Sequence, residues 1–320
     1  MAAMLRALES VVSVLAIIAI GFGLGRRAKA DGQAMALLSR LVMSVALPAY
    51  MVANLMGGYD RARLLALLPG LPVPFIVMLL SYSLALPVAR AARISGTRRG
   101  VFASLFALSN TIFIGLPVNE ILFGAASLPF VLLYYIANTT LFWTIGVYGI
   151  ARDAAAMGGK PAARIVSVEG FRRMLSPPLL AFLASAILIL LGVKIPPFLL
   201  DLTKTVGGMT TPLSMIFVGM AVASVDWRNI RPDLDLALLL GGRFVLSPLL
   251  LVLAVRWTDL PQLMKSVFLI QASMPAMTQV PIVARAYGAD AEYAGVMTSI
   301  TTVASLLTIP VYMGLVGFVF

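Results

Sequence analysis

Residues 109–120 of the chain read SNTIFIGLPVNE and lie inside a long apolar stretch. Pro117 has no amide hydrogen and its ring clashes with the preceding turn, Leu116 is pushed towards extended geometry, and Gly115 permits a bend. A helix broken here exposes backbone amides and carbonyls in the middle of the stretch. In a bilayer each such group costs several kcal/mol unless protein, water or a ligand satisfies it. The sequence therefore predicts a broken membrane helix with a functional interruption.

A second stretch of the same character occurs in the other half of the chain. Residues 273–281 read SMPAMTQVP, with prolines on both sides of a polar pair. A single shift of 164 residues aligns the two halves and matches Pro48 with Pro212, Ser109 with Ser273, Pro117 with Pro281 and Gly124 with Gly288. Each half holds five apolar spans, and because five is odd the second half enters the membrane from the opposite side. This arrangement is typical of the inverted repeats of secondary transporters.

Composition places the chain in the membrane. Of its 320 residues 61% are hydrophobic and 12% are charged, and the mean hydropathy is +1.00, whereas a soluble domain carries about 25% charged residues. The apolar stretches are apolar on nearly all faces, which favours helices over a barrel of alternating strands. We expect an all-α integral membrane protein with ten transmembrane helices, near residues 10–25, 35–57, 64–89, 101–123, 128–150, 177–193, 199–223, 234–255, 265–287 and 294–318.

The basic residues set the expected topology. With the N-terminus outside, the cytoplasmic loops hold 14 Lys and Arg residues and the outer loops hold 7. This bias predicts that both termini lie on the outer side of the membrane, and the expected membrane is the inner membrane of the cell. The net charge of +11 is explained by these loops, so no nucleic-acid partner is expected. Residues 1–150 form the first repeat, 151–176 a cytoplasmic linker and 177–320 the inverted second repeat. Residues 165–175 suit either a short helix on the membrane surface or a disordered linker.

The two interrupted spans are the predicted site. They run antiparallel, so two helix N-termini, each with about half a positive charge, would point at their crossing and suit a carboxylate. The candidate substrate-binding residues are Asn110, Thr111, Gly115, Pro117, Asn138, Met274, Pro275, Thr278, Gln279 and Pro281.

Three charged side chains inside apolar spans need separate interpretations. Glu120, about one turn after Pro117, is either a proton or ion carrier or a residue of the outer rim. Arg40 and Arg243 are expected to extend to the cytoplasmic interface in preference to pairing with a substrate.

Several segments resemble the auxin efflux carrier family, which includes plant PIN proteins and bacterial transporters often called malonate permeases. The resemblance lies in residues 41–48, in the Asn-x6-Pro-x6-Gly spacing of residues 110–124, in Ser176-Pro177-Pro178, in residues 211–221 with Pro212 and Gly219, and in residues 274–288.

The resemblance implies a specific architecture. It implies a five-plus-five inverted repeat with crossed, broken helices four and nine, similar to sodium/proton antiporters and bile-acid symporters. Spans 1, 2, 6 and 7 would form a scaffold and spans 3–5 and 8–10 a mobile transport domain, with dimerisation through the scaffold. Asn110, Pro117 and Pro281 would be the crossover residues.

The functional expectation is a secondary carrier of a small organic anion, such as a mono- or dicarboxylate, that works by elevator-type alternating access. The alternative is a cation/proton antiporter or a sodium-coupled symporter of similar fold. An enzyme is not expected, because the chain has no Cys and no His and no two acidic residues share the core of an apolar span. No cofactor and no metal site is predicted, and no phosphate-binding Gly-x4-Gly-Lys-Ser/Thr loop is present.

Overall fold

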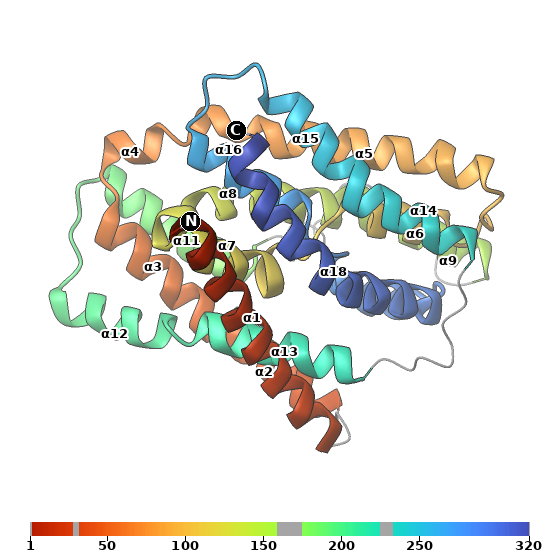
Figure 1. Cartoon of the computed structure of the whole chain (residues 1–320), viewed down its shortest axis with the longest axis horizontal. Helices are drawn as coiled ribbons and strands as arrows, with labels where there is room; N and C mark the ends of the chain where they lie inside the picture. The colour runs from red at the N-terminus through yellow and green to blue at the C-terminus, as the bar shows by residue number, and fades with distance from the viewer. Residues whose placement is uncertain (1, 28–31, 159–174, 225–232, 320) are drawn as a thin grey trace. The chain divides into compact units, whose positions relative to one another are not determined.

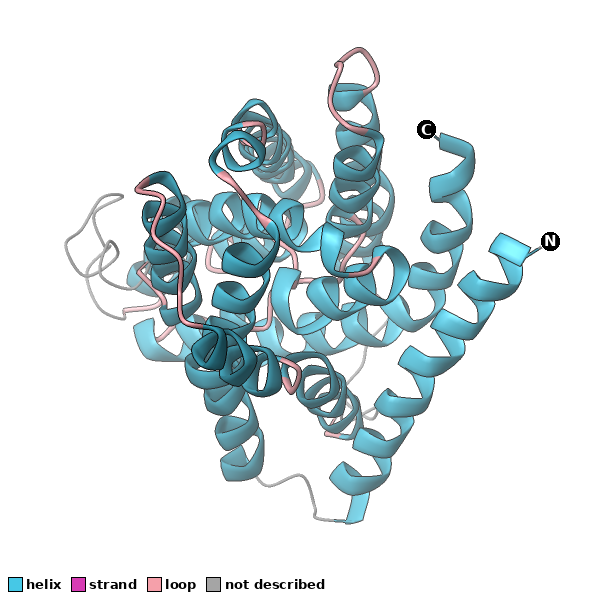
Figure 2. Cartoon of the chain, turned by 90° about the vertical axis from the view of Figure 1, so that its left-hand side faces the viewer, coloured by secondary structure: helices cyan, strands magenta, loops and turns pink. Residues whose placement is uncertain are grey.

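The computed structural model describes residues 2–27, 32–158, 175–224 and 233–319. Figure 2 shows that the described chain consists of helices and loops. Its one departure from helical pairing is an isolated antiparallel bridge between Ser109 and Ala276. The expected all-α class is therefore confirmed for the part of the chain that the structure describes. Of the predicted linker, residues 159–174 lie outside the described residues, and with them nearly all of the segment 165–175.

The helices divide into two compact units. Unit 1 contains α1 (Ala2–Arg27), α2 (Gly32–Leu41), η1 (Val42–Ala46), α3 (Leu47–Gly58), α4 (Arg61–Leu65), η2 (Leu68–Gly70), most of η3 (Thr111–Gly115), α7 (Leu116–Phe123), η4 (Ala125–Ser127), the start of α8 (Leu128–Leu141), α11 (Pro177–Leu190), α12 (Pro197–Gly207) and α13 (Thr210–Ala223).

Unit 2 contains the remaining described elements. These are α5 (Pro72–Ala91), α6 (Arg99–Ala107), the end of α8, η5 (Phe142–Gly146), α9 (Val147–Ala156), α14 (Leu234–Gly241), η7 (Gly242–Leu246), α15 (Ser247–Val255), α16 (Gln262–Ala272), α17 (Gln279–Tyr287) and α18 (Ala291–Val319).

Small residues hold unit 1 together. The long helix α1 runs beside α13 (Figure 1), and α3 packs on both α11 and α12. A Cβ atom on Gly21 would lie 2.3 Å from the carbonyl oxygen of Ile216, so the two backbones are in direct contact. Lipid supplies no hydrophobic driving force between helices, and close backbone approach at small residues replaces it.

Large apolar side chains fill unit 2. There α6 packs between α5 and α9, α15 packs on α5, and α17 on α18. Phe102, Phe142 and Phe268 have no exposed surface. Most residues of α6 and α16 are buried, so these two short helices are surrounded by protein, which is the condition for a non-helical backbone at membrane depth.

Among the described residues, six stretches are long and apolar enough to cross a membrane: Gln33–Gly58, Arg61–Ala91, Ala125–Ala156, Pro197–Ala223, Leu234–Val255 and Ala291–Gly317. They coincide with six of the ten predicted spans. Thr111–Phe123 and Pro177–Leu190 are shorter apolar helices, which fall in the fourth and sixth predicted spans. The described residues therefore support a multi-pass helical membrane protein, whereas the number ten and the inverted repeat stay predictions.

A recurring local pattern is a π-helical turn followed by proline. η1 precedes Pro48, η3 precedes Pro117 and η7 precedes Pro248, each at the start of the next α-helix. A proline lacks the N–H and its ring clashes with the carbonyl four residues earlier, and a widened turn accommodates both defects. Proline in these spans therefore modifies the helix without ending it.

This pattern corrects the predicted position of one break. The helix of the fourth span is interrupted at residues 108–110, seven residues before Pro117, and Pro117 itself lies inside the helix that follows. In the ninth span the interruption covers residues 273–278, and Pro281 lies in the first turn of α17. Here the helix starts close to the predicted place.

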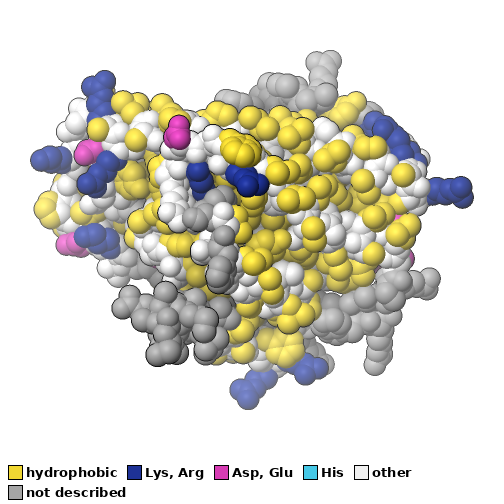
Figure 3. Space-filling view, turned by 45° about the horizontal axis from the view of Figure 1, so that its top comes forward, with side chains coloured by type: hydrophobic (Ala, Val, Ile, Leu, Met, Phe, Trp, Pro, Cys, Tyr) yellow, Lys and Arg dark blue, Asp and Glu magenta, His cyan; other side chains and the backbone are white. Residues whose placement is uncertain are grey.

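The described surface is largely apolar. Hydrophobic side chains are spread widely over the face shown in Figure 3, and most of the Lys and Arg side chains drawn there lie towards its edges. Phe198, Ile282 and Leu307 are 68%, 68% and 77% exposed. Exposed apolar surface of this extent is expected of a protein that is solvated by lipid.

The contact between α1 and α13 gives a stability prediction. Gly21→Ala should lower the unfolding free energy by about 1–3 kcal/mol, because the new methyl group overlaps the backbone of Ile216. Thermal unfolding of the purified protein in detergent measures the change. Gly23→Ala is the matched control, because no atom lies within 4 Å of its added Cβ. Equal midpoints for the two variants would contradict the packing argument.

Candidate functional site

The two interrupted helices of unit 2 pair with each other. After α6 ends at Ala107, residues 108–110 run antiparallel to the interruption between α16 and α17. The amide of Asn110 donates to the carbonyl of Pro275 at 2.8 Å, and the amide of Met277 donates to the carbonyl of Leu108 at 3.1 Å. Each interruption therefore satisfies backbone groups that the other leaves without a helical partner. We call this pairing the crossover.

Side chains from two further helices complete the crossover. Asn138 of α8 accepts from the amide of Ser109 and donates to its carbonyl, both at 3.0 Å, and its Nδ2 also lies 3.8 Å from the sulfur of Met277. Thr301 of α18 accepts from the amide of Ala276 at 3.2 Å. Asn138 and Thr301 have no exposed surface. An amide side chain can replace a strand partner in this way because it carries both a donor and an acceptor.

Charged side chains neutralise both ends of α6. At its N-terminal end the buried carboxylate of Asp153 accepts from the amide of Val101 at 2.9 Å. At its C-terminal end the guanidinium of Arg243 donates to the carbonyl of Phe106 at 3.1 Å, and its other terminal nitrogen donates to the carbonyl of Ala272 at 2.6 Å. A negative group at the start of a helix and a positive group at its end both stabilise the helix dipole.

The expectation that Arg243 extends to the membrane interface is wrong. Its side chain is completely buried and joins the last turns of α6 and α16. The reason is that helix C-terminal carbonyls buried in protein are stronger partners for a guanidinium than the distant interface, because they are fixed and partly negative.

The start of α17 borders the crossover, and polar side chains of α8, α16 and α17 contain buried oxygen atoms without hydrogen-bond partners. Thr278 is its N-cap residue and makes no side-chain capping bond. The buried oxygens Thr139 Oγ1, Gln271 Oε1 and Gln279 Oε1 have no hydrogen-bond partner among the described residues. The amide of the Gln271 side chain donates to the carbonyl of Thr111 at 3.3 Å. Buried polar atoms without partners are expected to meet water or a ligand.

The structure distributes the predicted site residues over both units. Those of unit 2 belong to the two interrupted spans and to α8: Asn110, Thr111, Asn138, Met274, Pro275, Thr278, Gln279 and Pro281. Gly115, Pro117 and Glu120 belong to unit 1. The role of all of them in substrate binding stays a prediction.

Glu120 has a defined environment within unit 1. Its two carboxylate oxygens accept hydrogen bonds from the hydroxyls of Tyr50 in α3 and Thr211 in α13. The side chain therefore links three helices, because Glu120 itself lies in α7. A carboxylate with two hydroxyl donors is well satisfied without a coupling ion.

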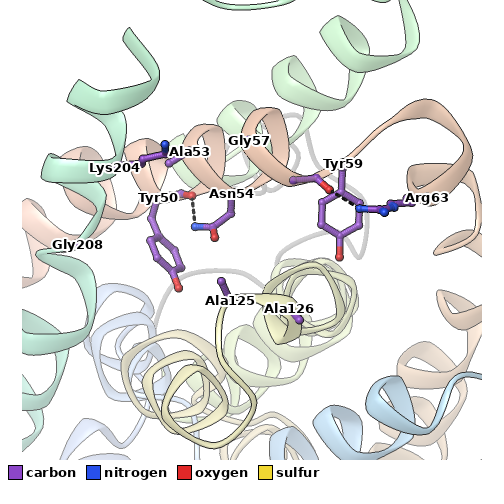
Figure 4. Close-up of a pocket in the computed structure, with 11 residues that line it drawn as sticks. Tyr50, Ala53, Asn54, Gly57, Tyr59, Arg63, Ala125, Ala126, Lys204 and Gly208 are labelled. Atoms are coloured by element: carbon purple, nitrogen blue, oxygen red, sulfur yellow. Dashed lines mark hydrogen bonds between the residues drawn. The ribbon is translucent and has the colours of Figure 1, made fainter. Parts of the chain in front are cut away.

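Unit 1 also contains a cavity of about 520 Å³, shown in Figure 4. Tyr50, Asn54 and Tyr59 line it together with two cations, Arg63 and Lys204. Both cations already have partners. Arg63 donates to the carbonyl of Gly58 at 3.2 Å, and Lys204 lies 3.5 Å from the carboxylate of Asp201. The cavity is therefore a weaker candidate for an anion site than the crossover.

Sequence reasoning missed or undervalued several residues that build the crossover. In the sequence Ser109 stands out only as a match to Ser273, Thr301 lies in the tenth predicted span, and Asp153 falls in the predicted linker 151–176. Arg243 carried the clearest signal, because an arginine inside an apolar span with no nearby acid in the sequence is a functional candidate by default.

Comparisons with known proteins identify the family of the chain. A family described as membrane transport protein matches residues 6–313. An uncharacterized transporter of Methanothermobacter thermautotrophicus is 26% identical over 314 residues, which cover 95% of this chain and 96% of the relative. An uncharacterized transporter of Methanocaldococcus jannaschii is 24% identical over 291 residues, 86% of this chain and 88% of the relative. The match of nearly the whole chain shows that the protein belongs to the membrane transport protein family of auxin efflux carrier-like transporters, and that it is a transporter and not an enzyme.

Proposed function

We propose that this transporter is a secondary carrier of a small organic anion, such as a mono- or dicarboxylate, and that the anion binds at the crossover. The observation that carries the proposal is the pairing of two interrupted helices deep inside unit 2, with Asn138 and Thr301 holding the break. Interrupted helices in transporters form their substrate sites at mid-membrane. Because the chain belongs to a transporter family, a substrate site at the crossover fits its role in transport.

Electrostatics favours an anionic substrate. The first turn of α17 starts at the crossover, and a helix N-terminus carries about half a positive charge. The partners given above for Asn138 and Thr301 are backbone groups and the sulfur of Met277, and none of these partners is an acidic side chain. In the first turn of α17 the amide of Val280 donates to the carbonyl of Met277 at 3.2 Å and Pro281 has no N–H, which leaves the amide of Gln279 as the main-chain donor for a carboxylate.

The two units support an elevator-type cycle. Unit 1 contains the helices of the predicted spans 1, 2, 6 and 7 together with α7 of span 4 and the start of α8, and unit 2 contains α6 of span 4 and most of spans 3, 5, 8, 9 and 10. We assign the first to the scaffold and the second to the moving part that carries the crossover. The same proposal includes dimerisation through the scaffold, location in the inner membrane, and termini on the outer side of the membrane. An anion that leaves a cell gains about 2.3 kcal/mol per charge for each 100 mV of inside-negative potential.

The crossover proposal predicts loss of transport without loss of protein. Asn138→Ala removes two hydrogen bonds to Ser109, each worth about 1 kcal/mol, and a cost of 1.4 kcal/mol is about tenfold in rate. Uptake of labelled acids into proteoliposomes should fall about tenfold or more in Asn138→Ala, and a similar fall is expected for Asn110→Ala.

Thr144→Val is the control for these two variants. Thr144 belongs to the same membrane span as Asn138, and its hydroxyl donates only to carbonyls of its own helix. It should transport at the wild-type rate. Full activity of Asn110→Ala and Asn138→Ala would refute the crossover site, and a response to sodium or pH without any acid would favour the cation/proton antiporter.

A structural role of Glu120 makes a separate prediction. Glu120→Gln keeps the shape of the side chain but removes the charge that strengthens the hydrogen bonds from Tyr50 and Thr211. We expect a lower midpoint of thermal unfolding in detergent and an unchanged pH profile of transport. If the variant unfolds normally but loses its pH dependence, Glu120 is a proton carrier instead.

A further inference from the structure

The position of Arg243 is determined by backbone contact. It follows Gly242 in the π-helical turn η7, and a Cβ atom on Gly242 would lie 1.9 Å from the ring of Phe106. The absence of a side chain at this position lets η7 approach the end of α6. The guanidinium of Arg243 is then within hydrogen-bond distance of the carbonyls of both Phe106 and Ala272.

The charge of Arg243 is balanced without an acid. In the described part of the chain no carboxylate lies within ion-pair distance of it, and its ionisable neighbours are the phenols of Tyr134 and Tyr312. An unpaired buried cation is very costly. The last turns of α6 and α16 each carry about half a negative charge, and together they match the single positive charge of the guanidinium.

These two helix ends are groups that bind a coupling cation in other carriers. In transporters with discontinuous helices, unwound carbonyls and half-helix C-terminal ends coordinate Na⁺ or interact with a proton carrier. Here both ends already receive hydrogen bonds from Arg243. A second cation at this place would meet the fixed positive charge at close range, and no cluster of three acidic side chains that could hold it occurs among the described residues.

We propose that Arg243 is a built-in counter-cation of the crossover, which takes the place of a dissociable coupling ion between the C-terminal ends of α6 and α16. The inference rests on the proposed function, because it describes the coupling of that same site. It assigns Arg243 as a positioning residue: it fixes the two helix ends and does not contact the substrate. Transport by the wild-type protein should then need neither Na⁺ nor any other added cation.

The experiment uses the full chain in proteoliposomes with an acid that the wild type transports. Wild-type flux should be equal in sodium and in choline buffers. Arg243→Ala should lose at least tenfold in flux in choline, and should regain most of it when guanidinium chloride is added at millimolar concentration. Part of the flux should also return with Na⁺, so that the variant becomes cation-dependent. Arg243→Lys should keep an intermediate flux, since an ammonium keeps the charge but lacks the planar fork.

Arg256→Ala is the matched control, because Arg256 is an exposed arginine of the same unit that lies over the ring of Trp257. It should behave as wild type in every buffer. A merely structural arginine predicts a variant that neither guanidinium nor Na⁺ restores, and this result would overturn the proposal. A requirement of the wild type for Na⁺ would overturn it as well, and so would full flux of Arg243→Ala in choline.

Thermal unfolding in detergent separates this inference from the proposed function. If the wild type transports none of the acids, the organic-anion proposal fails, and the role of Arg243 is decided by stability alone. Millimolar guanidinium should then raise the unfolding midpoint of Arg243→Ala towards that of the wild type, because a ligand that binds only the folded state stabilises it. Choline at the same concentration should not. Equal responses of the variant to both salts would overturn the built-in cation.

Discussion

A polypeptide in a bilayer has no water with which to satisfy its backbone, and the arrangement of unit 2 follows from this constraint. Two helices stop short, and the amides and carbonyls at their interruptions bind each other across the crossover. What the two segments leave unsatisfied is taken up by Asn138 and Thr301. A non-helical backbone can therefore exist among buried helices, and a site with main-chain polarity becomes available where side chains alone would give an apolar core.

The crossover also brings the C-terminal ends of α6 and α16 together, and these two partly negative ends repel each other unless a positive group lies between them. Two C-terminal ends meet at Arg243, and the N-terminal end of α6 meets Asp153. At the positive end of α17 the N-cap residue Thr278 makes no side-chain capping bond. Both ends of α6 and the C-terminal end of α16 thus meet charged side chains, and the positive start of α17 favours a negative ligand. This asymmetry connects the packing of the unit with the proposed transport of anions.

Much of this could be read from the sequence, and the errors have physical causes. Composition and spans gave the helical membrane class, and Pro275 and Pro281 located the interruption in the ninth span, because prolines flank it closely. Pro117 gave a wrong position for the break in the fourth span, because a π-helical turn accommodates this proline within the helix. The interruption lies at residues 108–110, where Ser109 pairs with Ala276 and Asn138, which are distant in the sequence. Arg243 was misjudged for the same reason: its partners are carbonyls of two distant helices, which no local pattern reveals. The count of ten spans depends on helices that are short or broken, and for such helices length and hydropathy do not identify a membrane span.

The choice of main-chain oxygens as partners for Arg243 has a consequence for the conditions under which the protein can work. An arginine held by a carboxylate loses its partner when acid protonates that carboxylate, so an ordinary buried ion pair is a pH switch. Peptide oxygens gain no proton in the physiological range, and arginine stays charged throughout it. The junction of α6 and α16 is therefore indifferent to the proton gradient across the membrane in which it sits. The junction should therefore stay assembled throughout the transport cycle even when the medium outside the cell is acidic.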